Sequence, residues 1–145
     1  MSGAFTVRTT TWGRDRPAIS SVREPVFVIE QKIDAREEFD AIDPICDHIL
    51  AQDNDGRAIG TGRIDAHGKI GRIAVLSEWR RSGVGRAILK KALELARDKG
   101  FGRVYLFAQV SAMGFYEREG FSGYGDRFSE AGIEHRAMER RILDR

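Results

Sequence analysis

The hydrophobic pattern changes its period twice in the middle of the chain, and this change constrains the fold more than any other feature. Three segments read as β-strands, with a turn at 53–56 between the first two: 46–52, 58–65 and 69–76. Residues 84–96 then carry apolar side chains at helical spacing and lead to Gly100, which suits a helix C-terminus. Residues 104–108 are apolar throughout, as is typical of a strand buried on both faces and reached by a βαβ crossover. The pattern predicts an α/β fold with a mixed central sheet.

The rest of the chain supplies shorter elements around this centre. Residues 5–11 alternate as an opening strand. Apolar spacings of three and four predict a helix over 18–31, entered near Asp15 and Pro17 and kinked or divided at Pro25. The later elements are a short helix at 34–39, a helix at 111–119, and two final strands at 121–124 and 135–142 around a loop at 125–132. There is no internal repeat or interdomain linker, so residues 1–145 are predicted to form a single domain.

The composition fits an ordinary globular protein. A chain of 145 residues can bury about two thirds of the surface that its unfolded form exposes, so it needs no disulfide or structural metal to fold. Cys46 is the one cysteine, which excludes disulfide scaffolds and Cys-rich zinc sites. The longest apolar run, 104–108, is far shorter than the roughly 18 residues that cross a bilayer. Residues 1–14 contain no apolar signal segment, so we expect a cytoplasmic protein without a membrane partner.

The formal net charge of +2 conceals an uneven layout. Nine acidic and two basic residues fall within 30–55, whereas five basic and no acidic residues fall within 80–91. The first segment favours cations and the second favours anions. Taken alone, the charges fit equally well with two solvated surfaces. The basic stretch is short and not interleaved with aromatic residues, which disfavours a nucleic-acid partner.

The most informative motif is the junction between the strand at 69–76 and the helix that follows it. The chain there reads Arg80-Arg81-Ser82-Gly83-Val84-Gly85-Arg86-Ala87. Glycines before a helix expose unpaired backbone amides, and the positive end of the helix dipole adds to their attraction for anions. Because three arginines surround this turn, a pyrophosphate would meet both amides and guanidinium groups. The alternative is a tight strand-to-helix turn that is basic by chance.

Other phosphate and nucleophile motifs fit this turn less well. A Walker loop ends in Gly-Lys-Ser/Thr, and here Gly85 precedes Arg86. A dinucleotide fingerprint requires a third glycine and opens a parallel fold, whereas an antiparallel meander precedes this turn. A nucleophile elbow requires glycine where Arg80 stands, so Ser82 is not a nucleophile of that kind.

The turn resembles the acyl-CoA signature (Gln/Arg)-x-x-Gly-x-Gly/Ala of the GCN5-related N-acetyltransferases, the GNAT family. Residues 112–121, Ala-Met-Gly-Phe-Tyr-Glu-Arg-Glu-Gly-Phe, are similar to the second cofactor segment of that family, and the order of elements agrees from Phe5 to Ile142. Residues 23–31 and 131–135 resemble a subset of small bacterial members whose acceptors are mostly unassigned. The resemblance implies a single-domain GNAT-like fold in which the middle strands of the mixed sheet splay apart between flanking helices.

For function, the resemblance implies an enzyme that moves an acetyl group from acetyl-CoA to a primary amine by direct attack in a ternary complex, with no metal. Tyr116 is implied as the acid that protonates the departing thiolate, and the amide of Ala74 or Val75 as the donor to the thioester carbonyl. Gln109 stands where many members carry an asparagine that contacts pantetheine. The family often pairs through a C-terminal strand, which leaves a homodimer open. The implied cofactor contacts are Ile73, Ala74, Val75, Arg80, Arg81, Ser82, Gly83, Val84, Gly85, Arg86, Gln109, Phe115 and Tyr116.

The groups that bind the amine and take its proton are less defined. Glu30 is a candidate for both roles, and an ordered water chain is an alternative base. Further candidates for the base are Asp43, Asp47 and His48, whose spacing fits no metal-ligand template. His67 and His135 are expected at ordinary turn and sheet positions. Two other classes of function stay open: a non-catalytic acyl-CoA-binding or sensing module of the same fold, and an interaction domain.

Overall fold

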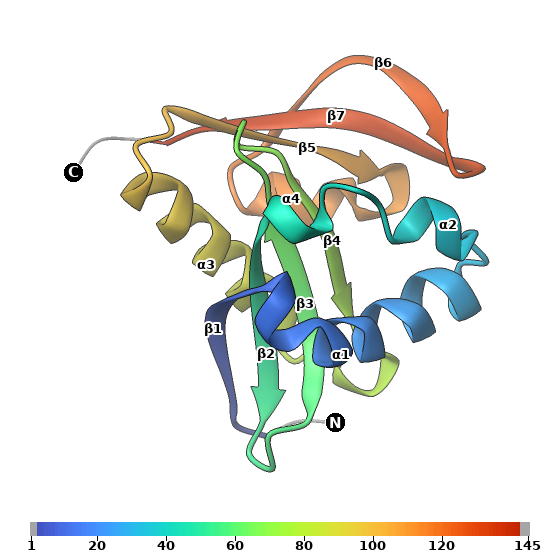
Figure 1. Cartoon of the computed structure of the whole chain (residues 1–145). Coiled ribbons are helices and arrows are strands. Elements are labelled where there is room, and N and C mark those ends of the chain that lie inside the picture. The colour runs from blue at the N-terminus through green and yellow to red at the C-terminus, as the bar shows by residue number, and fades with distance from the viewer. Residues whose placement is uncertain (1–2, 143–145) are drawn as a thin grey trace.

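The structure, a computed structural model, describes residues 3–142 (Figure 1). The strands are β1 (Phe5–Thr11), β2 (Asp47–Asp53), β3 (Ala58–Ile64), β4 (Ile70–Val75), β5 (Arg103–Gln109), β6 (Ser122–Glu130) and β7 (Ile133–Arg141). The α-helices are α1 (Trp12–Arg23), α2 (Ala35–Glu38), α3 (Val84–Asp98) and α4 (Met113–Arg118). A π-helix, η1 (Glu24–Glu30), and three short 3-10 turns, η2 (Asp43–Ile45), η3 (Ser77–Trp79) and η4 (Val110–Ala112), join them.

The strands form two antiparallel sheets that meet at one point. The first sheet has the order β1, β2, β3, β4, and the second has the order β5, β7, β6. Within residues 3–142, the pairing between the sheets is limited to a parallel bridge between Lys69 and Tyr105, where the Tyr105 amide donates to the Gly68 carbonyl at 3.1 Å. Beyond this bridge β4 and β5 diverge (Figure 1). The predicted α/β fold with splayed middle strands is therefore confirmed.

Helices cover both faces of the first sheet. Alternate residues of β2 point to opposite sides, because side chains along a strand alternate. Ile49 and Ala51 join the hydrophobic cluster that contains α3, whereas Leu50 joins the cluster that contains α1. In Figure 1 α1 lies in front of the sheet and α3 behind it. Gly60 lets α3 approach β3 closely, since a Cβ at this position would lie 2.8 Å from the Cδ1 atom of Ile88.

The helix predicted over 18–31 begins earlier and changes its winding. It starts at Trp12, because the Thr11 side chain caps it by accepting a hydrogen bond from the Arg14 amide at 3.2 Å. Its second half is the π-helix η1, with Pro25 in the first turn. Proline has no amide hydrogen and disturbs the i to i−4 hydrogen bonds. The helical turn at Trp12 was not predicted, but a kink at Asp15, with φ −127° and ψ 24°, separates it from the rest of α1. The predicted entry near Asp15 and the division at Pro25 are therefore both confirmed.

Strand β5 is not buried on both faces, contrary to the prediction for 104–108. Val104, Leu106 and Ala108 are buried, whereas Phe107 is 37% exposed. The three buried side chains join the hydrophobic cluster that contains α3, whereas the alternate side chains point to the opposite face, which keeps contact with solvent. A wholly apolar run lacks the alternation that would have revealed this half-exposed face.

The loop predicted at 125–132 is mostly strand. β6 continues to Glu130 and pairs with β7 across a two-residue turn, at the price of an irregularity between Tyr124 and Phe128. Ala131 and Gly132 form that turn, both with positive φ, 52° and 74°. Such turns match the twist of the two strands. Gly125, also at positive φ, looks like a loop residue in sequence but lies in the irregular part of β6.

Candidate active site

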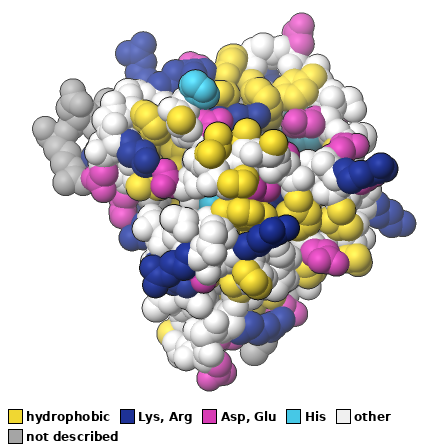
Figure 2. All heavy atoms as spheres, in the orientation of Figure 1, with side chains coloured by type: hydrophobic (Ala, Val, Ile, Leu, Met, Phe, Trp, Pro, Cys, Tyr) yellow, Lys and Arg dark blue, Asp and Glu magenta, His cyan; other side chains and the backbone are white. Residues whose placement is uncertain are grey.

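A cleft of about 740 Å³ opens where β4 and β5 diverge. Its walls come from β4, β5, η1, α2, the first turn of α3 and the β6–β7 hairpin. Nine of the expected site residues line it: Glu30, Ile73, Ala74, Val75, Arg80, Gly85, Gln109, Phe115 and Tyr116. The other five, Arg81, Ser82, Gly83, Val84 and Arg86, do not line this cleft and lie in the turn and first helical turn beside Gly85. On the face that Figure 2 shows, basic and acidic side chains are interspersed around hydrophobic ones, so charges that are separated along the sequence mix in space.

The N-terminus of α3 forms one end of the cleft. Gly83 caps the helix with φ of 86°, which favours glycine, and the first intrahelical bond runs from the Ala87 amide to the Gly83 carbonyl at 3.0 Å. The amides of residues 84–86 precede that bond and have no partner within the helix. Gly85 is different, because a Cβ there would meet only Phe115 at 3.6 Å and Val75 at 3.7 Å, which are ordinary contacts. Packing within the protein therefore does not require glycine at 85.

The open edge of β4 carries backbone groups that the sheet does not use. The Leu76 amide donates to the Ile59 carbonyl of β3 at 2.9 Å. Because successive residues of a strand direct their backbone groups to opposite edges, Val75 and Ile73 direct theirs toward the cleft. In agreement, the Val75 carbonyl accepts a hydrogen bond from Arg80 Nε at 3.2 Å from the cleft side. Of the two amides expected as carbonyl donors, the alternation favours Val75 over Ala74 and adds Ile73.

Arg80 holds Glu30 rather than standing free. Its two terminal nitrogens donate to the two carboxylate oxygens of Glu30, each at 2.7 Å. These hydrogen bonds lower the pKa of the Glu30 carboxyl. Both side chains are nearly half exposed, so water screens the pair. The pair links η1 to the turn after β4 and keeps the carboxylate ionised.

A second link crosses the cleft at its rim. Gln109, at the end of β5, donates through Nε2 to the Oε1 atom of Gln31 at 2.8 Å. Gln31 follows η1, so this hydrogen bond joins the two opposite walls. The side-chain amide of Gln109 thus lines the cleft and reaches its opposite wall.

Tyr116, on α4, lines the cleft and lies in a cluster of aromatic side chains. Its ring packs edge-on against Phe115, with centroids 5.0 Å apart, and against Phe121 at 5.9 Å. Burial raises the pKa of Tyr116 to about 12. No hydrogen bond to its hydroxyl is found among residues 3–142. The phenol therefore stays protonated and has a donor to spare in the cleft.

The base candidates Asp43, Asp47 and His48 do not line the cleft. Asp43 is 1% exposed and accepts hydrogen bonds from Arg23 and Arg63, each at 2.7 Å. Burial opposes ionisation of Asp43, but those bonds outweigh it and lower the pKa. Asp47, at the start of β2, pairs with Lys99, the residue that follows α3, at 2.7 Å. His48 is 1% exposed, with burial lowering its pKa, and donates through Nε2 to the Asp43 carbonyl at 2.8 Å.

Sequence reasoning missed a different set of charged side chains at the other end of the cleft. They are Glu37, Glu38, Asp40, Lys69, Arg72, Glu130 and His135. They come from α2, β4, β6, β7 and the segments beside them, so no sequence spacing brings them together. Glu37, Glu38 and Asp40 belong to the acidic segment 30–55, and His135 belongs to the segment 131–135 that carries the family resemblance, but neither signal indicated that these side chains meet in one cleft.

Two further searches covered the residues that the structure describes. Within 3–142 no group of three or more His, Cys, Asp or Glu side chains is arranged to hold a metal ion. None of the helices in the same range is long and apolar enough to span a membrane.

Comparison with known proteins decides the family. The family model for the acetyltransferase (GNAT) domain matches residues 26–142. The chain belongs to the GNAT family. YjcF of Bacillus subtilis, described as an uncharacterized N-acetyltransferase, is 39% identical over 121 residues, which cover 81% of this chain and 86% of YjcF. An acyl-CoA N-acyltransferase from Pseudomonas aeruginosa and ElaA of Escherichia coli are solved structures with 27% identity and a TM-score of 0.83; each match covers 94% of this chain and 99% of the other.

Membership in the GNAT family makes this protein an acetyl-CoA-dependent acyltransferase. Acetyl-CoA is the co-substrate that the family uses. Family membership thus gives the coarse activity.

Proposed function

We propose that this GNAT protein transfers the acetyl group of acetyl-CoA to a primary amine by direct attack in a ternary complex. The observation that carries the proposal is the cleft between β4 and β5, which has free helix amides at one end and ionisable side chains at the other. An anionic cofactor suits the first end and an amine suits the second. The proposal treats residues 1–145 as one catalytic domain.

The pyrophosphate of CoA would bind at the N-terminus of α3. The amides of residues 84–86 and the nearby Arg81 supply donors and positive charge. Gly85 leaves room for close approach, which explains a glycine that packing does not require. Arg86 already contacts Glu119 at 3.0 Å, and Arg80 already contacts Glu30. These two arginines would therefore attract the pyrophosphate by long-range electrostatics and not as direct ligands.

The pantetheine arm would run along the open edge of β4. Its amides would pair with the backbone of Ile73 and Val75, as an added strand pairs with a sheet edge. Gln109 would contact the arm from β5 in place of its bond to Gln31. The thioester carbonyl would then accept a hydrogen bond from a β4 amide. A fixed donor of this kind lowers the barrier by about 3 kcal/mol as negative charge develops on that oxygen.

Tyr116 would protonate the sulfur that leaves. A pKa of about 12 keeps the phenol protonated across the physiological range, so the proton is present whenever the thiolate forms. No covalent enzyme intermediate is needed, because the cleft brings amine and thioester together. Glu30 and the other acidic side chains of the cleft would draw a cationic amine toward this end.

The experiment is a thiol-release assay with acetyl-CoA and a panel of amines: glucosamine, spermidine, L-lysine and a lysine-containing peptide. We expect thiol release that depends on at least one amine. Tyr116→Phe should lower kcat by about a hundredfold, the lower end of acid catalysis, and leave acetyl-CoA affinity nearly unchanged. Tyr124→Phe, on the partly exposed face of β6, is the matched control and should retain full activity.

Two outcomes would contradict parts of this proposal. Binding of acetyl-CoA without turnover on any amine would favour the alternative, a non-catalytic acyl-CoA-binding module of the same fold. Equal turnover by Tyr116→Phe and the wild type across pH would reject Tyr116 as the acid.

A further inference from the structure

We propose that His135 is the base of the reaction and that its Nε2 atom takes the proton that the acceptor's ammonium group loses before the amine attacks. The inference deepens the proposed function and rests on it. It assigns a chemical role to a histidine that the sequence placed at an ordinary position in the sheet.

The pairing of β7 with β5 brings His135 into the cleft. In that pairing His135 lies opposite Gln109. Ile73 of β4, Gln109 and His135 all line the cleft.

One hydrogen bond fixes the tautomer of His135. Its Nδ1 atom lies 2.7 Å from the carbonyl oxygen of Ile133. A carbonyl oxygen can only accept, so Nδ1 carries the hydrogen and the neutral ring keeps its lone pair on Nε2. The ring also stacks on Phe128, with the planes 22° apart and the centroids separated by 5.9 Å. The side chain is 10% exposed, and the bond and the stacking hold its orientation.

Two charged side chains lie near His135 at this end of the cleft. The carboxylate of Glu130, on β6, lies 3.9 Å from Nε2, too far for a hydrogen bond. Glu130 is 50% exposed and connects the ring to solvent, where the proton can leave. The ammonium group of Lys69, just before β4, faces the same end of the cleft, 3.9 Å above the ring of Phe107, and limits the local negative charge.

Several carboxylates of the cleft are poorer bases because arginines hold them. Glu30 is bound by Arg80, Glu38 by Arg23 and Arg72, and Asp40 by Arg63 and Arg72. Burial raises the pKa of Glu38 despite its two arginines, but its Oε1 atom already accepts a hydrogen bond from Arg23 at 3.0 Å and forms an ion pair with Arg72 at 3.1 Å. Protonation of these carboxylates would cost the ion pairs. His135 has an accepting atom without such a partner among the described residues.

The proton and electron balance is complete with His135 and Tyr116. The ammonium gives one proton to Nε2, and the freed nitrogen lone pair forms a bond to the thioester carbon. The C–S bond then breaks with its electron pair on sulfur. Sulfur takes the hydroxyl proton of Tyr116, and the new amide nitrogen loses its second proton to the phenolate. The products are the acetamide, free CoA and one proton, which leaves His135 past Glu130 for solvent.

The test uses two variants of the full chain and the panel amine with the highest turnover. His135→Asn keeps an amide that can donate to the Ile133 carbonyl but cannot take up a proton. We expect it to lower kcat/KM by about 10²-fold or more, the usual contribution of a base, while acetyl-CoA still raises its Tm as in the wild type. His67→Asn, in an exposed turn, is the matched control and should keep full activity. In His135→Ala, added imidazole should raise turnover at least tenfold, in proportion to its concentration.

Each contrary outcome has a distinct meaning. Turnover of His135→Asn within about threefold of the wild type would overturn the assignment, since a base contributes far more than that. Absence of imidazole rescue in a variant that still binds acetyl-CoA would also overturn it. Loss of the acetyl-CoA-induced rise in Tm in both variants would give His135 a structural role instead. Absence of turnover by the wild-type protein on every amine would refute the proposed function, and this inference with it.

Discussion

Gly85 allows the cofactor site to be tested separately from the fold. In the structure, a Cβ at position 85 would lie 3.6 Å from the Phe115 ring and 3.7 Å from Val75, and no backbone strain accompanies it. Gly85→Ala should therefore fold and gain stability, because the unfolded chain loses conformational freedom and alanine favours a helix. Gly85→Leu should also fold, but its longer side chain would project into the cleft between these two neighbours.

The magnitudes follow from chain length and from the geometry. A gain of about 0.4–1 kcal/mol is typical when glycine is replaced by alanine at an unstrained position. For 145 residues the unfolding entropy is about 0.3 kcal/mol/K, so the Tm of Gly85→Ala should rise by about 1–3 °C. Acetyl-CoA at a hundred times its Kd should add about 2.7 kcal/mol, or about 9 °C, to the wild type. The same concentration should add less than about 2 °C to Gly85→Leu, since the leucine occupies the site.

Thermal unfolding with and without acetyl-CoA measures all of these shifts. Coenzyme A without the acetyl group serves as a second ligand, because the proposed contact of Gly85 is with the shared part of the molecule. A Gly85→Leu variant that keeps the full shift would refute the reasoning that this end of the cleft binds CoA. A Gly85→Ala variant that loses several degrees without ligand would refute the structural premise that the position is free of packing constraints.

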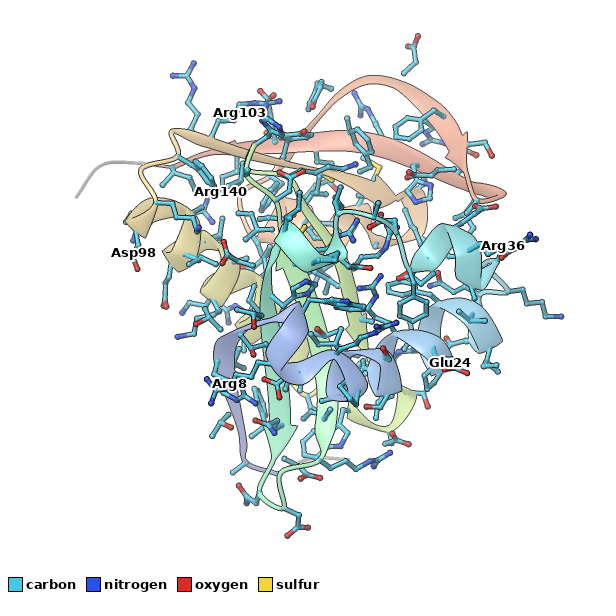
Figure 3. All side chains as sticks on the ribbon, in the orientation of Figure 1. Arg8, Glu24, Arg36, Asp98, Arg103 and Arg140 are labelled. Atoms are coloured by element: carbon cyan, nitrogen blue, oxygen red, sulfur yellow. The ribbon has the colours of Figure 1, made fainter. Side chains whose placement is uncertain are left out.

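The remaining predictions concern the buried charges behind the cleft. Asp43→Asn should destabilise the fold by about 3–5 kcal/mol and lower Tm by about 10 °C or more, because it removes the buried carboxylate that Arg23 and Arg63 share and leaves the network with an uncompensated positive charge; Asp34→Asn, whose partner Arg36 projects outward from α2 in Figure 3, should leave Tm unchanged. Burial lowers the pKa of His48 below 6.5, so only the unfolded chain takes up a proton just below that pH, and stability should fall by up to about 1.4 kcal/mol per pH unit on acidification. In urea unfolding at pH 7.0 and 5.5, His48→Gln should reduce this fall, and an equal fall in wild type and variant would contradict the linkage.

Local features of the fold were predictable from the sequence because their causes are local. The strand-to-helix turn at Gly83 requires a positive φ, and the stripe of α3 requires one apolar face. Both follow from backbone geometry and from the spacing of a few neighbours along the chain. The same reasoning was wrong where the cause was distant: β5 is half exposed because only one of its faces packs into the core with α3, and β6 extends past Gly125 because β7 pairs with it.

The cofactor half of the candidate site could be anticipated for the same reason. Its main parts, the end of β4, the turn and the start of α3, are contiguous in sequence and carry a specific pattern of glycine and arginine. The pattern could not indicate that Arg80 is held by Glu30, fifty residues away, or that Gln109 bonds to Gln31. Each of these partners is set by the packing of η1 over the cleft.

The sequence by itself determined that this chain is an α/β protein whose strand-to-helix turn resembles the GNAT signature, because periodicity and glycine placement act over a few residues. Only the tertiary structure decided which acidic and basic groups face the acceptor. The acidic segment 30–55 is divided by folding: Asp43 is neutralised in a buried network, whereas Glu30 lines the cleft. His135 enters the site through the pairing of β7 with β5, a contact between residues far apart in the chain. The net charge of a segment is the sum of its residues, but what each charged side chain can do depends on its burial and its partners. In these cases, long-range packing sets both.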